Sequence, residues 1–165
     1  MSETPASTRA QIVALVPRLR RFARTLTRHR DDADDLVQLA LERALSRLAQ
    51  WRPEERLDGW LFGIVRNAWI DEVRTRQRWN RVLAPGEEAV NVGDAAAESI
   101  ANRLSIEAAL AGLPEEQRSA VALVLIEGLS YKEAAHVMDV PIGTLTSRLA
   151  RARETLQSVL GGADP

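Results

Sequence analysis

Apolar residues recur at helical spacing in the first part of the chain. Residues 9–29 carry apolar residues at helical spacing, namely Ile12, Leu15, Val16, Leu19, Phe22, Ala23 and Leu26. An α-helix has about 3.6 residues per turn, so this spacing places them on one face. Pro17 lies inside the stretch, and because proline lacks a backbone N–H, we expect it to kink or restart this helix.

Two more helices are expected before residue 80. The second should begin at an acidic cluster, since carboxylates stabilise the positive end of a helix; the cluster is Asp31, Asp32, Asp34 and Asp35. Its inward residues would be Leu36, Leu39, Ala40, Ala44 and Leu48, and its outer residues Asp35, Gln38 and Glu42. The third helix should span about 59–79, with a core stripe of Leu61, Ile64, Val65 and Ala68 and a polar face of Asn67, Asp71, Arg74 and Arg78.

Residues 130–153 predict two short helices separated by a tight turn. Ser130 and Glu133 have the spacing of a capping box, which places a helix start at Tyr131. The helical pattern is then interrupted, and Thr144 can cap a second helix whose core residues are Leu145, Leu149, Ala152 and Leu156. The opposite face carries Thr144, Ser147, Arg148 and Arg151. Hydroxyls and guanidiniums of this kind match phosphates and base edges, so this face predicts a DNA-recognition helix.

Residues 80–102 predict a flexible linker, because glycine, proline, small residues and acids are mixed there without an apolar period. No strand-like alternation occurs elsewhere in the sequence. The expected fold is therefore all-α, with small helical domains at 1–79 and 103–165 on either side of the linker.

Composition narrows the class of protein. The 165 residues are 45% hydrophobic, yet they contain no apolar run of membrane-spanning length and no signal-peptide pattern. We therefore expect a cytoplasmic protein without membrane insertion. Cysteine is absent and the two histidines, His29 and His136, are far apart, which argues against a metal site. No catalytic constellation is recognisable, so neither an enzyme nor a bound cofactor is expected.

Charge and tryptophan are unevenly distributed. The formal net charge is −1, but residues 1–79 hold 15 basic and 11 acidic side chains, which permits local contact with phosphates. All four tryptophans, Trp51, Trp60, Trp69 and Trp79, lie in or beside the third helix at intervals of nine or ten residues. They cannot share one helix face, so some must be exposed or at edges. Exposed aromatic rings beside arginines can hold unstacked bases, each stack being worth about 1–3 kcal/mol.

Three segments together resemble a small bacterial sigma factor of the extracytoplasmic-function group. They are DDADDLVQLALERAL, WLFGIVRNAWIDEVRTRQR and the stretch from LAGLPEEQR to LARARETL. The resemblance implies that 1–79 is a region 2 helical bundle, which binds the polymerase clamp and melts the minus-10 element. It implies that 103–165 is a region 4 helix-turn-helix, which reads the minus-35 element and touches the flap. Core RNA polymerase, promoter DNA and an anti-sigma factor are the partners that follow from it.

The resemblance also assigns residues. The DLVQ motif corresponds to Asp35, Leu36, Val37 and Gln38, and with Glu42 it would bind the clamp, although Leu39 stands where an acid is usual. The loop of residues 50–58 would capture a flipped base, and the minus-10 strand would be lined by Arg66, Asn67, Asp71, Arg74 and Arg78. The minus-35 positions are Thr146, Ser147, Ala150 and Arg151, with Thr144 beside them and Arg148 suited to the DNA backbone. Thr146 and Ala150 replace positions that are often longer or basic, so the preferred minus-35 sequence is expected to differ.

Two alternatives come from other classes of protein. A helix-turn-helix repressor would bind a duplex operator as a dimer, but it would have no use for the clamp motif or the tryptophan-rich helix. A sigma-like decoy would titrate an anti-sigma factor without reading DNA. Such decoys usually lose the basic recognition face and carry a receiver domain, whereas this chain keeps Arg148 and Arg151 and is too short for a receiver.

Overall fold

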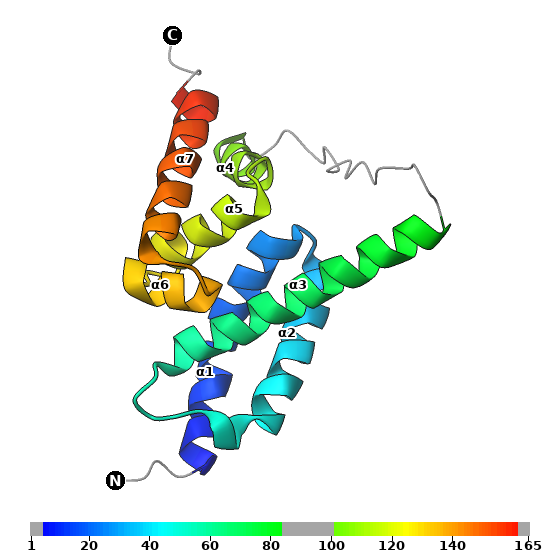
Figure 1. Cartoon of the computed structure of the whole chain (residues 1–165), viewed down its shortest axis with the longest axis vertical. Helices are drawn as coiled ribbons and strands as arrows, with labels where there is room; N and C mark the ends of the chain where they lie inside the picture. Colours follow the sequence, from blue (N-terminus) through cyan, green and yellow to red (C-terminus); the bar gives the residue numbers. More distant parts are fainter. Residues whose placement is uncertain (1–4, 84–100, 162–165) are drawn as a thin grey trace.

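The computed structural model describes residues 5–83 and 101–161, and every regular element in these ranges is helical. The first domain consists of α1 (Pro5–Thr27), α2 (Arg30–Ser46), a 3₁₀ turn η1 (Leu48–Gln50) and α3 (Leu57–Leu83). Each of the three long helices packs against the other two, and α3 extends beyond them (Figure 1). Phe22 of α1 and Phe62 of α3 meet edge to face in the core, with ring centroids 5.2 Å apart.

The helices of the first domain differ from the prediction at Pro17 within α1 and at the start of α2. α1 continues through Pro17 instead of restarting there. Pro17 is exposed while Ile12 and Leu19 on either side are buried, so core packing on both sides outweighs one lost backbone bond. α2 begins at Arg30 after the N-cap residue His29, which makes no side-chain cap. Two of the four acids, Asp31 and Asp32, therefore lie in the first turn rather than at the cap, and at that place they still interact favourably with the helix dipole.

The second domain consists of α4 (Ala101–Ala111), α5 (Glu115–Val121), the π-helical segment η2 (Ala122–Ile126), α6 (Tyr131–Met138) and α7 (Ile142–Leu160). The capping box is confirmed, because Ser130 Oγ accepts from the Glu133 amide at 3.1 Å and the Glu133 carboxylate accepts from the Ser130 amide at 3.0 Å. α6 ends at Asp139, whose φ of 53° is left-handed. The predicted start of the second helix at Thr144 is wrong: Pro141 is the N-cap, and the Thr144 amide already donates to its carbonyl at 3.0 Å.

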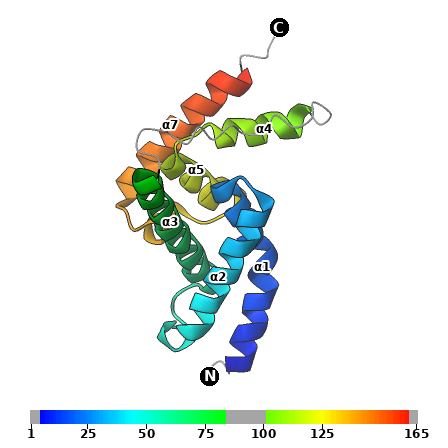
Figure 2. The same cartoon turned by 90° about the vertical axis from the view of Figure 1, so that its right-hand side faces the viewer.

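The two domains pack against each other. α1 contacts α5 and η2, and α3 contacts α6, as the two views show (Figures 1 and 2). Their buried residues form one continuous hydrophobic cluster. α3 runs four residues beyond the predicted end at Trp79, and residues 84–100 of the predicted linker lie outside the described residues. Within the described part, no helix is both long and apolar enough to cross a membrane.

A cluster of charged side chains joins the domains, and we call it the junction. Glu127, whose side chain is fully buried, accepts from Arg21 through two bonds of 2.8 Å and from Arg18 at 3.2 Å. Arg18 also donates to the Glu127 carbonyl at 3.0 Å and to Asp58 at 3.1 Å, and its guanidinium lies over the Phe62 ring.

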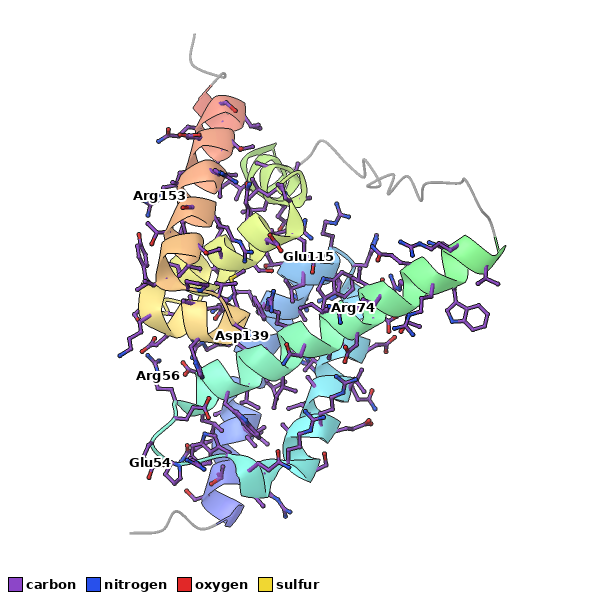
Figure 3. The ribbon with its side chains drawn as sticks, viewed as in Figure 1. Glu54, Arg56, Arg74, Glu115, Asp139 and Arg153 are labelled. Carbon is purple, nitrogen blue, oxygen red and sulfur yellow. The ribbon has the colours of Figure 1, made fainter. Side chains whose placement is uncertain are left out.

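The junction continues along the start of α3. Arg56 donates to Asp58 at 2.8 Å and to both oxygens of Glu133 at 2.9 and 3.0 Å, and it lies between α3 and α6 (Figure 3). Glu55 and His136 approach to 3.3 Å beside it. A carboxylate on α6 and one directly after η2 are thus paired with arginines on α1 and on the segment that enters α3.

The junction shifts the pKa values of two carboxyl groups. Burial would raise the pKa of Asp58, but its bonds to the Gly59 amide and to the Arg18 and Arg56 guanidiniums outweigh burial and lower it. The Ser130 amide, followed by Arg56, lowers the pKa of Glu133. The Glu127 contact in turn raises the pKa of Arg21.

Acidification should destabilise the protein through these two carboxyl groups. Their folded pKa values lie below the unfolded values of about 3.9 and 4.3, so their stabilisation is present above that range and is lost as the pH falls through the folded values. The free energy of unfolding, measured by urea denaturation with circular dichroism, should therefore fall less steeply with acid in the double variant Asp58→Asn, Glu133→Gln. Glu154→Gln, at an exposed position of α7 outside the junction, is the control. Equal slopes in the double variant and the wild type would show that the junction carboxylates contribute nothing.

Candidate nucleic-acid and polymerase-binding surfaces

The predicted clamp-binding residues form an exposed strip on α2. Asp35, Gln38 and Glu42 are all exposed, and their spacing of three and four residues puts them on one face. Leu39, which stands where an acid is usual, is half-buried and packs against the core. The side chain at position 39 therefore contributes to packing, while its polar neighbours face outward.

The predicted minus-10 residues on α3 differ in their exposure to solvent. Asn67, Asp71, Arg74 and Arg78 are exposed, and Figure 3 shows Arg74 on this helix. Asp71 is paired with Arg43 of α2 at 3.0 Å, whereas Arg74 and Arg78 form no ion pair with any described residue. Their guanidiniums are available for phosphates or bases.

Arg66, in contrast, is half-buried at the side of α3 that faces the second domain. Burial lowers its pKa, and the charges that act on it next, the carboxylate of Glu115 and the guanidinium of Arg148, belong to the second domain. Within this arrangement Arg66 is separated from the exposed strip formed by the other four residues.

The tryptophans confirm the prediction that some are exposed or at edges. Trp79 is 60% exposed near the end of α3, while the other three are half-buried against the core. Trp51 donates through Nε1 to the Glu55 carbonyl at 3.1 Å, which fixes the fold of the loop 50–58. The Trp69 Nε1 atom is buried without a hydrogen-bond partner.

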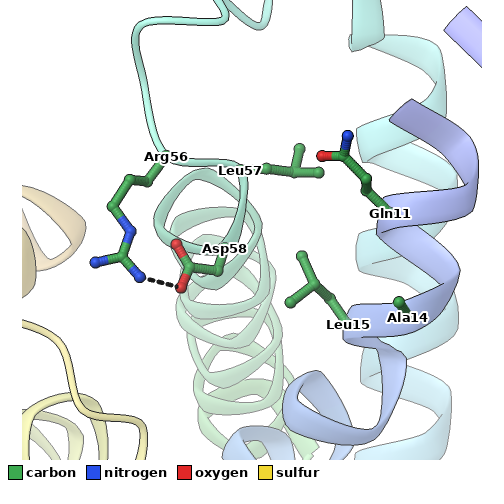
Figure 4. A pocket seen from close by; sticks show the side chains of 6 residues that line it. All are labelled: Gln11, Ala14, Leu15, Arg56, Leu57 and Asp58. Atoms are coloured by element: carbon green, nitrogen blue, oxygen red, sulfur yellow. Dashed lines mark hydrogen bonds and ion pairs between the residues drawn. The ribbon is translucent and has the colours of Figure 1, made fainter. Parts of the chain in front are cut away.

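The loop 50–58 itself is held against the second domain by Arg56 and Glu55 of the junction. A shallow groove lies beside it, between α1 and the start of α3, lined by Gln11, Ala14, Leu15, Arg56, Leu57 and Asp58 (Figure 4). The Arg56–Asp58 pair closes one side of this groove. The loop predicted to capture a base is therefore engaged in a contact between domains.

The predicted recognition face of α7 is largely exposed. Thr146, Ser147, Ala150 and Arg151 are exposed, and Arg151 makes no ion pair with a described residue. The Thr146 and Ser147 hydroxyls donate to the carbonyls of Ile142 and Gly143 at 2.9 and 3.0 Å, so their oxygens remain able to accept. The predicted core residues on the opposite face are confirmed, with Leu145, Leu149 and Ala152 buried and Leu156 half-buried.

Thr144 and Arg148 are the two members of the predicted face that are half-buried. Arg148 pairs with Glu116 of α5 at 3.1 Å, and its Nη1 atom is buried without a partner. This guanidinium ties α7 to α5 instead of extending outward like that of Arg151.

The junction was missed by sequence reasoning, although part of its signal is visible. Glu127 follows the apolar run from Val121 to Ile126, and a lone carboxylate in such a setting indicates a buried charge that needs partners. The partners themselves are more than 100 residues away, at Arg18 and Arg21, and no local pattern identifies them. No group of His, Cys, Asp or Glu side chains in the described ranges is arranged to hold a metal ion.

Family comparisons match both domains. The Sigma-70, region 4 family matches residues 103–156, and the family of the Sigma2 domain of PhyR matches residues 12–66. The ECF RNA polymerase sigma factor EcfG of Rhodopseudomonas palustris is 40% identical over 157 residues, covering 93% of this chain and 85% of that protein. SigM, an ECF RNA polymerase sigma factor of Mycobacterium tuberculosis, is 36% identical over 143 residues, covering 87% and 71% of the two chains.

Solved structures show the same fold. The sigma factor RpoE of Bartonella quintana, in complex with the anti-sigma factor NepR, superposes with a TM-score of 0.80 at 30% identity, covering 94% of this chain and 98% of RpoE. CnrH, in complex with the cytosolic domain of CnrY, has a TM-score of 0.70 at 23% identity, covering 98% and 92% of the two chains. Because the sequence similarity extends over both domains and most of the chain, this protein belongs to the ECF RNA polymerase sigma factors.

Proposed function

We propose that this sigma factor binds core RNA polymerase through α2 and directs it to promoters through two separate DNA-contacting faces, one on each domain. The observation that carries the proposal is the separation of exposed polar faces on three rigid helices. These are the strip Asp35, Gln38 and Glu42 on α2, the strip of Asn67, Arg74 and Arg78 on α3, and Ser147 with Arg151 on α7. RNA polymerase catalyses RNA synthesis, and the sigma factor determines at which promoter the polymerase starts.

The α7 face suits duplex readout. Arg151 carries a forked donor that can bind the two acceptors of a guanine, and the hydroxyl oxygens of Thr146 and Ser147 can accept from an exocyclic amine. Ala150 leaves room for a base methyl group. Thr144 is half-buried beside these residues, and Arg148 is half-buried and paired with Glu116. Arg148 would reach the DNA backbone only if that ion pair is released, and base reading is left to its exposed neighbours.

The α3 face suits a strand that has been opened. Arg74 and Arg78 can neutralise phosphates, and Asn67 can bond base edges that become accessible once pairing is lost. Asp71, held by Arg43, orients the same face. Arg66 and the loop 50–58 would join this site for melted DNA. Unstacking costs a few kcal/mol per base, which contacts of this kind offset.

An anti-sigma factor is the expected regulatory partner. RpoE and CnrH were each solved in complex, with the anti-sigma factor NepR and the cytosolic domain of CnrY respectively, and both cover nearly the whole of this chain. A protein that works with core polymerase in this way resides in the cytoplasm.

A sigma-like decoy is a second candidate, favoured by one observation. Residues 12–66 match the Sigma2 domain of PhyR, and the PhyR of Bartonella quintana is described as an anti-anti-sigma factor complexed with NepR. The sigma-factor assignment is favoured by the 40% identity with EcfG over both domains and by the exposed Arg151. The two candidates differ in one property, since a decoy binds an anti-sigma factor but does not support transcription.

The function is tested directly by run-off transcription on genomic fragments with purified core polymerase. We expect discrete transcripts that start at fixed sites and depend on the added chain, because the sigma factor confers promoter selection on the core enzyme. A complete lack of specific transcripts across the fragment library would reject the proposal and favour the decoy.

The double variant Gln38→Ala, Glu42→Ala should weaken binding to core polymerase at least tenfold, since the proposal makes both side chains central clamp contacts, and truncating a central interface residue costs more than about 1 kcal/mol. Helical content by circular dichroism should not change, because both side chains are exposed. Glu54→Ala, an exposed carboxylate elsewhere in the first domain, serves as the control. Core affinity equal to that of the wild type would show that this strip is not the clamp-binding face.

Arg151→Ala should weaken binding to the upstream duplex by about 1–3 kcal/mol and relax preference at one base pair, because it removes a bidentate contact. Arg153→Ala on another face of the same helix is the control. Arg74→Ala and Asn67→Ala should instead leave closed-complex binding nearly unchanged and reduce strand opening, as measured by permanganate footprinting. If a pre-melted template rescues Arg151→Ala but not the α3 variants, the two roles are assigned the wrong way round.

A further inference from the structure

We propose that an apolar ridge on α7 reads the C5-methyl groups of thymines in the upstream promoter element, and that Ile142 is one of the residues that determine this specificity. The ridge consists of Ile142, Thr146 and Ala150. The inference rests on the proposed function, because it names the chemical group that the α7 face recognises. Ile142 belongs neither to the predicted core stripe of this helix nor to its predicted recognition face, so its role is new.

Ile142 lies at the exposed start of α7. It is the first residue of the helix and is 53% exposed, whereas Leu145 three residues later is fully buried. Residues spaced four apart form a ridge along a helix, which places Ile142 in line with Thr146 and Ala150, both of them exposed. From position 142 to position 150 the ridge is about 12 Å long, comparable with about three to four base-pair steps of duplex DNA.

The ridge has no hydrogen-bond donor left for a base. The side chains of Ile142 and Ala150 contain no polar atom, and the Thr146 hydroxyl donates to the Ile142 carbonyl at 2.9 Å. Beside the ridge, the Ser147 hydroxyl donates to the Gly143 carbonyl at 3.0 Å. Adenine and guanine are read in the major groove mainly by side chains that donate to N7, and guanine also through O6. The ridge therefore lacks the groups that would select a purine.

The thymine methyl group is the apolar feature that a base pair presents in the major groove. Alanine and the methyl group of threonine are typical contacts for it, and the exposed side chain of Ile142 is of the same chemical kind. In a helix-turn-helix, the first residues of the recognition helix contact base edges, and Ile142 occupies that place. Arg151, exposed on the same helix, supplies the donor for a guanine, so the ridge and Arg151 read different base pairs.

A second exposed apolar residue on α7 provides a matched comparison. Val159 is 57% exposed and lies near the end of the helix, about 26 Å along the axis from Ile142. A recognition helix contacts bases through its N-terminal part, so Val159 is too far from the groove to contact the same base pairs. Both residues are β-branched, exposed and on one helix, and they differ in their distance from the proposed contact.

Promoter fragments with modified bases test the inference on the unchanged chain. An upstream element would first be selected from a random duplex library with holoenzyme formed from core polymerase and the full chain. Each thymine of the element would then be replaced by uracil, which lacks only the methyl group, and the affinity measured by competition with the labelled parent fragment. At one or more positions uracil should weaken binding about three- to fourfold, which corresponds to about 0.8 kcal/mol for one buried carbon group. At such a position 5-methylcytosine should bind more tightly than cytosine.

Ile142→Ala connects this loss to the ridge. On the parent fragment the variant should bind at least about threefold more weakly than the wild type, because side-chain carbons that contact the methyl group are removed. On the fragment with uracil at the sensitive position, the variant and the wild type should differ by less than about twofold, because the methyl partner is already absent. Val159→Ala is the control and should bind both fragments as the wild type does.

The outcomes separate the inference from the proposed function. A selected element without thymine, or an affinity that no uracil replacement changes, would overturn the inference. If exchange of a G·C pair in the same element still weakens binding, the proposed function stands even so. Equal losses for Ile142→Ala on the thymine and uracil fragments would overturn the role of Ile142. If the holoenzyme selects no element at all, the proposed function fails and the inference fails with it.

Discussion

The ion pairs of Glu127 with Arg18 and Arg21 are the interaction on which the arrangement of the two domains depends. Glu127 is fully buried, and a buried carboxylate is tolerated only when its oxygens are bonded. Removing one partner of such a pair commonly costs about 3–5 kcal/mol, because the remaining charge is left without compensation. The choice of residue at positions 18, 21 and 127 is therefore coupled, although the positions lie more than 100 residues apart.

α3 links the core, the junction and the nucleic-acid surface in one element. Its buried face, with Leu61, Phe62 and Val65, forms the centre of the first domain, and its start contributes Asp58 to the junction. Its exposed end carries Arg74 and Arg78. Because a helix transmits orientation along its length, the packing of Phe62 and the ion pairs of Asp58 together set the direction in which these arginines project.

Local features of the sequence predicted the fold well, and long-range charge pairing was what they could not predict. The capping box at Ser130 and the stripe Leu145, Leu149 and Ala152 are local patterns with one structural solution, and both were confirmed. The predicted kink or restart at Pro17 did not occur, because the core packing on both sides of the proline keeps the helix continuous. The predicted cap at Thr144 was wrong because Pro141 already serves as the N-cap of α7. Arg66 and Arg148 are half-buried because a neighbouring domain or helix covers them. The periodicity of one helix does not show such a neighbour, so both arginines were predicted to be exposed.

A double-mutant cycle between Arg21 and Glu127 measures the central interaction most directly. The free energy of urea unfolding would be determined for the wild type, Arg21→Ala, Glu127→Ala and the double variant, with the content of helix monitored throughout. If the pair holds the domains together, the two losses should be non-additive, with a coupling energy above about 1 kcal/mol, within the range that contacting charged residues give. Additive losses, with a coupling energy near zero, would contradict the account, because they would mean that the buried carboxylate and the arginine stabilise the structure independently.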